Sequence, residues 1–387
     1  MTEIVLCDAT APEQVQEHLA RALAGSGPAV LVRDPRASRL VAANEETITQ
    51  APDGTALLIQ TSGTSGQPKT VALSAAALQA SAHAAHERLG GPGQWLLALP
   101  LTYIAGVSVL VRSQYSGTDP VFMPVGPFDA RAFLDAIEQM TGQRRYTALV
   151  PVQLARVLDE IDEHPERVET ARSLSAILIG GQALESDLRE RAEQAGLNIV
   201  ATYGSSETAG GCVYDGIPLP GVTIEIDSGT GEILIAASQL ATEYVGNPER
   251  TADVFLNRNG RRWYRTGDAG SFVDGTLTVL GRLDRVITSG GLKIDLDAVE
   301  AVVTGIQGCY SAVVVHIPDS EWGLRPAVVI PGDPDAGEIS ATVYDAIVAK
   351  LGRVAAPKVV CFIPEVPRLS SGKPDMVALS EYASAQK

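Results

Sequence analysis

The chain is poor in cysteine and in positive charge. Its cysteines are scattered, with no CxxC pair and no histidine at metal-binding spacing: Cys7, Cys212, Cys309 and Cys361. This spacing gives no sign of a metal site or a disulfide framework, and it predicts reduced thiols in the cytoplasm. Lysine and arginine number 30 against 46 acidic residues, a formal net charge of -16. Such a surface repels polyanions, so nucleic acid is not an expected partner, and any anionic ligand must be held by a few local positive groups.

Long hydrophobic runs are also missing. No apolar stretch approaches the roughly 18 residues of a membrane span, and "MTEIVLCDATAPEQ" lacks the basic start and apolar core of a signal peptide. We therefore expect neither membrane insertion nor secretion. With 387 residues, 45% of them hydrophobic, the chain has room for two domains with substantial cores.

The periodicity of the first 280 residues predicts an α/β domain. Residues 55–60 (TALLIQ) read as a strand, "TVALS" resumes extended structure, and Ser74 is a predicted N-cap of the helix that follows. A strand at 176–179, a turn at Gly180-Gly181, a helix with Leu184, Leu188, Ala192 and Ala195 on one face, and a strand at 198–202 predict a parallel βαβ unit. Its loops meet at one sheet edge, where a ligand is expected.

The pattern changes near the C-terminus. "SFVDGTLTVL" predicts an antiparallel hairpin with its turn at Asp274-Gly275. After a boundary near Gly281, helix-like "DAVEAVVTG" and strand-like "SAVVVHI", "PAVVI" and "KVVCFI" predict a small α+β domain of about 100 residues.

The segment "QTSGTSGQPKT" at residues 60–70 is rich in hydroxyls and glycine. It is not a Walker A loop, because Pro68 stands where that motif requires glycine. Its backbone N–H groups and hydroxyls could wrap phosphate oxygens. A flexible linker explains the composition equally well.

Further clusters offer nucleotide chemistry. In "ATYGSSET" a tyrosine could stack on a base, a serine could touch a phosphate, and Glu207 is a hard oxygen ligand suited to Mg²⁺. In "WYRTGD", Asp268 could bind ribose hydroxyls. In "RLSSGKPD", Lys373 is a long, mobile point charge near the chain end. Each segment alone also fits an ordinary loop, a β-turn or a solvated tail.

These segments, taken in order from Leu57 to Lys373, resemble the acyl-adenylate-forming superfamily of acyl-CoA synthetases, luciferases and peptide-synthetase adenylation domains. "TSGTSGQPK" is similar to the family's phosphate loop, "ILIGGQAL" and "ATYGSSET" to its adenine and Mg²⁺ segments, and "EYVGNPERTADVF" and "WYRTGD" to its later core motifs. "GRLDRVITSGG" resembles the hinge, and "SSGKP" the catalytic-lysine motif. Any one match is weak, whereas the collinear series is specific.

The resemblance implies a role for each matched residue. Lys373, Glu207 and Thr64 would be catalytic, with Glu207 also the Mg²⁺ ligand. Rotation at a hinge at Asp284 would withdraw Lys373 and bring the CoA-binding glycines Gly290 and Gly291 to the site. The implied ATP-binding residues are Thr61, Ser62, Gly63, Thr64, Ser65, Gly66, Lys69, Gly180, Gly181, Tyr203, Ser206, Asp268 and Arg282.

The acid-binding residues are the part of the site that the family resemblance predicts least directly. The implied set is Tyr103, Arg112, Gly204 and Ser205. In "LALPLTYIAGVSVLVRS", Tyr103 stands where many family members carry histidine. Arg112 is a candidate for binding a second carboxylate of the acid, since its fork fits that geometry; a surface arginine is the alternative. His83 and His86, on a predicted helix, could flank the pocket.

The resemblance also implies the domain layout. A large N-terminal ATP- and acid-binding domain of αβαβα-type sheets with an antiparallel β portion is expected at residues 1–281, and a small mobile α+β domain at 282–387. The phosphate loop comes only about 60 residues into the chain, so a shortened N-terminal subdomain is expected.

The predicted function is an AMP-forming acid–thiol ligase that uses ATP, Mg²⁺ and CoA. Its expected partners are small molecules, with a homodimer as the one protein contact considered. Two alternatives stay open. An enzyme that loads an aryl or amino acid onto a carrier protein would share the core, and a non-catalytic nucleotide-binding module would share the ATP site.

Overall fold

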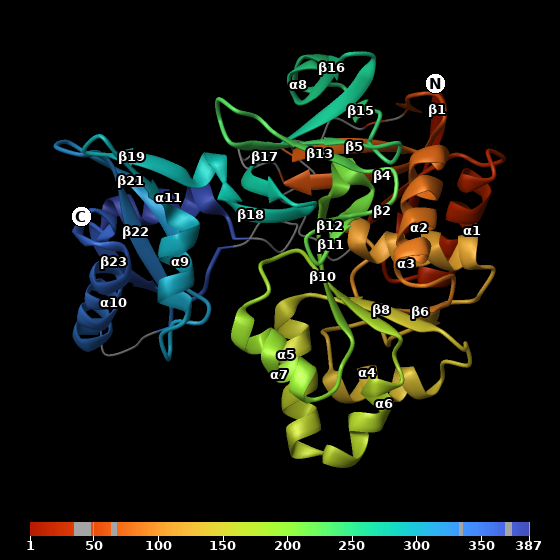
Figure 1. The fold of residues 1–387 in the computed structure, drawn as a ribbon, viewed down its shortest axis with the longest axis horizontal. Helices are drawn as coiled ribbons and strands as arrows, with labels where there is room; N and C mark the ends of the chain where they lie inside the picture. The colour runs from red at the N-terminus through yellow and green to blue at the C-terminus, as the bar shows by residue number, and fades with distance from the viewer. Residues whose placement is uncertain (35–47, 49, 63–67, 333–335, 368–373, 387) are drawn as a thin grey trace.

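The computed structural model describes residues 1–34, 48, 50–62, 68–332, 336–367 and 374–386. Within these residues the strands form four sheets (Figure 1). Two sheets and their helices make up most of the large domain, a third sheet is antiparallel, and the fourth belongs to the C-terminal elements.

The first sheet begins with a βαβ unit formed by β1 (Thr2–Asp8), α1 (Pro12–Leu23) and β2 (Ala29–Arg33). β2 runs parallel to β4 (Thr55–Ser62), which pairs antiparallel with β5 (Pro68–Ser74). The edge strands are β3 (Gln50–Ala51) and β15 (Glu243–Tyr244), giving the order β15-β5-β4-β2-β1-β3.

The second sheet contains the predicted parallel βαβ unit. β9 (Ala176–Ile179) and β10 (Ile199–Ser205) are parallel and joined through α7 (Ser186–Gln194), so the unit is confirmed, although the helix begins after Leu184. The sheet order is β12-β11-β10-β9-β8-β6-β7. Its other strands are β6 (Gln94–Leu97), β7 (Val121–Phe122), β8 (Arg145–Leu149), β11 (Gly210–Tyr214) and β12 (Ile217–Pro218).

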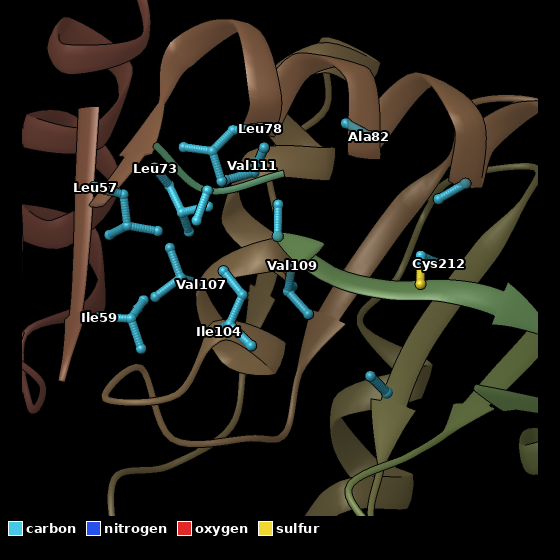
Figure 2. Close-up of a cluster of buried hydrophobic side chains, with 14 of the residues drawn as sticks. Leu57, Ile59, Leu73, Leu78, Ala82, Ile104, Val107, Val109, Val111 and Cys212 are labelled. Atoms are coloured by element: carbon cyan, nitrogen blue, oxygen red, sulfur yellow. The ribbon is translucent and has the colours of Figure 1, made fainter. Parts of the chain in front are cut away.

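Helices α2 (Ala75–Arg88) and α3 (Ile104–Ser116) lie between these two sheets. Apolar side chains from the helices and from β4 and β5 meet in one buried core (Figure 2). Ser74 caps α2 as predicted, because its hydroxyl accepts a hydrogen bond from the backbone N–H of Ala77 at 3.1 Å. A separate core on the other face of the second sheet involves α4 (Ala130–Glu138), α5 (Pro151–Glu163), α6 (Val168–Arg172) and α7.

The third sheet is antiparallel and has the order β13-β14-β17-β16, with β18 paired to β17. The predicted Asp274-Gly275 turn joins β17 to β18, and both residues have the positive φ that such a turn requires, 49° and 79°. The elements are β13 (Thr223–Ile226), β14 (Glu232–Ala236), α8 (Pro248–Val254), β16 (Phe255–Arg258), β17 (Arg261–Val273) and β18 (Thr276–Arg282).

The C-terminal elements form an α+β unit with its own hydrophobic clusters, beside β18 (Figure 1). Its elements are β19 (Val286–Ser289), β20 (Leu292–Asp295), α9 (Leu296–Thr304), β21 (Val313–Asp319), β22 (Gly323–Pro331), α10 (Ala336–Leu351), β23 (Val359–Ile363) and α11 (Met376–Ala385). The predicted fold class is thus confirmed. The boundary between residues 281 and 282 and the hinge at Asp284 stay predictions; they fall where β18 gives way to the short helix η3 (Leu283–Arg285). None of the helices in the described part of the chain is long and apolar enough to cross a membrane.

Candidate active site

A buried carboxylate lies just beyond the carboxyl end of β10. Glu207, in the short helix η2 (Ser206–Thr208), is 3% exposed. Its Oε1 is 2.6 Å from Nζ of Lys69 on β5 and accepts a 2.8 Å hydrogen bond from the Tyr244 hydroxyl of β15. Burial disfavours the charged carboxylate, but the Lys69 charge and these hydrogen bonds outweigh it and hold the pKa of Glu207 below its ordinary value. Lys69 of the first sheet therefore forms an ion pair with Glu207 at the edge of the second sheet.

The turn that carries Glu207 is fixed by its neighbours. Thr208 is fully buried; its hydroxyl accepts from the backbone N–H of Ser205 at 2.8 Å and donates to the carbonyl of Gly210 at 2.7 Å. Gly204 permits β10 and β11 to approach closely, because a Cβ there would lie 2.2 Å from the Gly210 carbonyl oxygen. These contacts hold the "YGSSET" segment in place at the carboxyl end of β10.

A second polar cluster joins β10 to the third sheet. The Tyr203 hydroxyl donates to Oδ2 of Asp268 at 2.6 Å, and Nη1 of Arg282 lies 3.0 Å from Oδ1. Arg282 also forks onto Asp284, with Nε and Nη2 each 3.0 Å from a carboxylate oxygen. Burial raises the pKa of Asp268 despite these donors, and burial beside this carboxylate also raises the pKa of Tyr203. Arg282 therefore links Asp268, the predicted ribose-binding residue, to Asp284, the predicted hinge residue.

One small cavity of about 40 Å³ brings together part of the predicted site. Five of its lining residues were predicted from the sequence: Tyr203, Gly204, Ser205, Asp268 and Arg282. The sequence did not single out the others, which are Thr208, Ile235, Tyr264 and Thr266. A larger cleft of about 510 Å³ lies elsewhere, against α8 and β16, and contains none of the predicted residues.

Two supporting residues were missed. Tyr244 belongs to "EYVGNPERTADVF", and its place in a quoted motif was the only signal. Glu232, 4% exposed, accepts from the backbone N–H of Gly267 at 3.0 Å and from the Arg265 fork at 2.9 and 2.7 Å. It thereby holds the turn before Asp268, although its surrounding sequence carries no motif.

Comparison with known proteins now identifies the family. A family model described as AMP-binding enzyme matches residues 3–245, and a second, AMP-binding enzyme C-terminal domain, matches residues 298–373. The chain belongs to the AMP-binding enzyme family. The predicted AMP-forming acyl-CoA ligase class is confirmed with it, which favours an enzyme over a non-catalytic nucleotide-binding module.

Relatives in the AMP-binding family match most of the chain. A probable 2-succinylbenzoate–CoA ligase of Mycobacterium tuberculosis is 39% identical over 366 residues, 93% of either protein. The 2-succinylbenzoate–CoA ligase of Escherichia coli K12 is 31% identical over 339 residues, 84% of this chain and 69% of that protein.

Solved structures agree with these relatives. O-succinylbenzoate coenzyme A synthetase from Bacillus subtilis in complex with AMP has a TM-score of 0.73 at 27% identity, covering 90% of this chain and 74% of that one. The same enzyme in complex with its acyl-adenylate intermediate has a TM-score of 0.74 at 27% identity, covering 97% and 78%.

Several site residues implied by the family resemblance lie away from this cavity or outside the described residues. Gly63, Thr64, Ser65, Gly66 and Lys373 lie outside the described residues, as does the side chain of Ser62. Thr61, the residue before the last of β4, pairs with Lys69 of β5. Gly180 and Gly181 follow β9 next to β10, and Gly290 and Gly291 form the turn between β19 and β20 in the C-terminal unit.

The predicted acid-binding residues divide into two groups. Gly204 and Ser205 line the cavity, and Tyr103 is the N-cap residue of α3. Arg112, further along α3, is 4% exposed, so the alternative of a surface arginine is wrong. The two histidines on α2 differ: His83 is exposed with its ring against Tyr115, whereas His86 is buried and hydrogen-bonded to Ser116 at 3.1 Å.

Proposed function

We propose that this enzyme is an AMP-forming 2-succinylbenzoate–CoA ligase of menaquinone biosynthesis. The observation that carries the proposal is the 39% identity to the mycobacterial relative over 93% of both chains. The segment "YIAGVSVLVRS" favours the same branch. The geometry supports the chemistry, because charged and polar side chains from three sheets converge at the carboxyl end of β10.

The proposed nucleotide site follows from that convergence. Asp268 and Arg282 would bind the ribose, and the Tyr203 ring would stack on adenine beside Gly180 and Gly181. Ser206, at the start of η2, would contact the α-phosphate. Lys69 and the segment 61–66 would hold the β- and γ-phosphates, with Thr64 among the catalytic groups.

Glu207 is the proposed Mg²⁺ ligand. A buried carboxylate with an ammonium group 2.6 Å away is already a site where the protein stabilises a cation next to fixed negative charge. A hard oxygen ligand of this kind suits Mg²⁺, which would neutralise developing phosphate charge when bound.

The proposed reaction has two steps. A carboxylate oxygen of the acid attacks the α-phosphorus of ATP, the bond to pyrophosphate breaks, and Lys373 stabilises the charge that develops. The sulfur of CoA then attacks the acyl carbon, and AMP leaves with the electrons of the C–O bond. Between the steps, rotation at Asp284 would exchange Lys373 for Gly290 and Gly291. We place the enzyme in the cytoplasm and propose a homodimer.

An acid screen tests the proposal. Pyrophosphate exchange is measured with 2-succinylbenzoate, simple benzoates, amino acids and fatty acids, followed by AMP release with CoA or with a phosphopantetheinylated carrier protein. The expected result is exchange with 2-succinylbenzoate and AMP release with CoA. Exchange with another acid alone, or AMP release with the carrier only, would overturn the assignment.

The role of Lys373 has its own test. Lys373→Ala should nearly abolish adenylate formation and leave thioester formation from a supplied acyl-adenylate largely intact, because the lysine serves the first step only. Both rates are measured on the same preparation, and equal loss of the two would contradict the role. Asp284→Pro, which removes hinge freedom, should give the opposite pattern.

A further inference from the structure

The short helix α8 has no part in the proposed reaction, yet it is fixed next to the strand that carries Lys69. It forms the second half of "EYVGNPERTADVF", and β15 lies in the first half. The Thr251 hydroxyl of α8 accepts a hydrogen bond from the backbone N–H of Tyr244 in β15 at 3.0 Å and donates to the Asn247 carbonyl at 2.8 Å. β15 pairs in turn with β5 (Figure 1). Side chains of α8 can therefore reach the surroundings of Lys69.

Two cations approach the ring of Tyr244. Lys69 Nζ lies 4.7 Å from the ring centroid, and the guanidinium carbon of Arg250, on α8, lies 5.9 Å from it. The hydroxyl of the same tyrosine donates to Glu207 at 2.8 Å and accepts from Lys69 at 3.2 Å. Burial and the Glu207 carboxylate raise the pKa of Tyr244, and the Arg250 cation opposes that rise. The charge of Arg250 therefore acts at the same place as the Lys69–Glu207 pair.

The two cations have one carboxylate between them. Glu207 is paired with Lys69 at 2.6 Å. Within the described part of the chain, Arg250 has no carboxylate at ion-pair distance, and its buried Nε has no hydrogen-bond partner. A second, unpaired cation repels the first, and an unbonded buried donor is costly, so stability alone does not account for Arg250.

This local excess of positive charge stands out against the rest of the protein. The chain has a formal net charge of -16, so an anionic ligand must be held by a few positive groups that the fold brings together. Lys69 and Arg250 are two such groups on one tyrosine ring. They indicate a ligand with more negative charge than a single lysine would serve.

We propose that Arg250 binds the β- and γ-phosphates of ATP together with Lys69. The inference rests on the proposed position of the triphosphate at Lys69. As a carboxylate oxygen of the acid bonds to the α-phosphorus, the bond from that phosphorus to the bridging oxygen breaks, and its electron pair leaves with pyrophosphate. The guanidinium fork binds two phosphate oxygens at once and stabilises the charge that collects on this leaving group.

A role in packing predicts a different result. If Arg250 served only to hold the Tyr244 ring, and through it Glu207, its loss would affect every nucleotide that binds at the site. Binding of the β- and γ-phosphates instead affects ATP and pyrophosphate and leaves AMP, which lacks both phosphates, unchanged. The comparison of ATP with AMP therefore separates the two roles.

The test measures the dissociation constants of ATP, pyrophosphate and AMP by titration calorimetry, with Mg²⁺ present and without acid or CoA. Arg250→Met should weaken binding of ATP and pyrophosphate about 10- to 100-fold and that of AMP less than about threefold, because charged hydrogen bonds to phosphate are lost. Arg250→Lys should retain part of the affinity, since a point charge replaces the fork. Arg156→Met, an exposed arginine on α5, is the matched control and should bind all three ligands like the wild type.

The ratio of the ATP and AMP dissociation constants is the deciding quantity, because loss of folded protein affects both ligands alike. Lys69→Met, measured in parallel, reports on the proposed triphosphate site itself. A ratio that changes in Lys69→Met but not in Arg250→Met would overturn this inference and leave the proposed function standing. A ratio that changes in neither variant would overturn the position of the triphosphate at Lys69, and the role of Arg250 with it.

Discussion

Replacing Lys69 by methionine isolates the role of the ion pair at the site. The substitution keeps most of the side-chain volume over the Tyr244 ring, from which Nζ is 4.7 Å away, and removes the charge. Glu207 would then be a buried carboxylate held by the Tyr244 hydroxyl alone among the contacts described above. Breaking a buried pair by removing one partner costs about 3–5 kcal/mol. Because the Lys69 side chain is 21% exposed, we expect the lower end, about 3 kcal/mol.

The predicted cost has a characteristic dependence on pH. In the wild type the folded pKa of Glu207 is below its ordinary 4.5, so its contribution to stability is complete above that value and is lost as pH falls through the folded pKa. In Lys69→Met, burial acts with little opposition and raises the pKa of Glu207. The variant's deficit should therefore be largest near pH 7.5 and shrink toward pH 5.

The assay is thermal unfolding of the wild type, Lys69→Met, Glu207→Gln and the double variant at both pH values. About 3 kcal/mol corresponds to a fall in Tm of about 5 °C for a domain of about 280 residues, whose unfolding entropy is about 0.6 kcal/mol/K. The double variant should be more stable than Lys69→Met, because no buried charge is left unpaired. Lys350→Met, an exposed lysine on α10, controls for lost charge. A Tm within about 1 °C of wild type, which is the ~0.5 kcal/mol scale of surface changes, would refute the reasoning, as would strictly additive single effects.

Two other predictions concern backbone packing and acid stability. Gly204→Ala should weaken ATP binding more than about tenfold in an equilibrium titration, because its Cβ would meet the Gly210 carbonyl oxygen at 2.2 Å and displace the edge of the site. Gly229→Ala, on a turn, is the control. Equal ATP affinities of Gly204→Ala and the wild type would contradict the prediction. His86 should make the protein less stable as pH falls from 6.5 to about 4, since the unfolded chain gains a proton that the folded one does not bind. Up to about 3 kcal/mol is expected over that window, so His86→Gln should flatten the fall in Tm between pH 7.5 and 5, and an unchanged slope would rule this out.

The sequence alone was sufficient wherever the cause is local. The Ser74 cap, the Asp274-Gly275 turn and the strands on either side of Gly180 follow from side-chain chemistry and φ preferences within a few residues. The order of the family motifs likewise indicated the ligase class and five residues of one cavity.

Only the tertiary structure could decide which of these residues meet. Glu207 of η2, Lys69 of β5 and Tyr244 of β15 lie up to 175 residues apart in the chain, and no local pattern encodes their contact. The same holds for Arg112, which the sequence could not distinguish from a surface arginine. Its burial depends on Trp95 and Tyr214, brought to α3 by the sheet that packs on it, because burial and the pairing of charge are properties of packed surfaces and not of neighbouring residues in the chain.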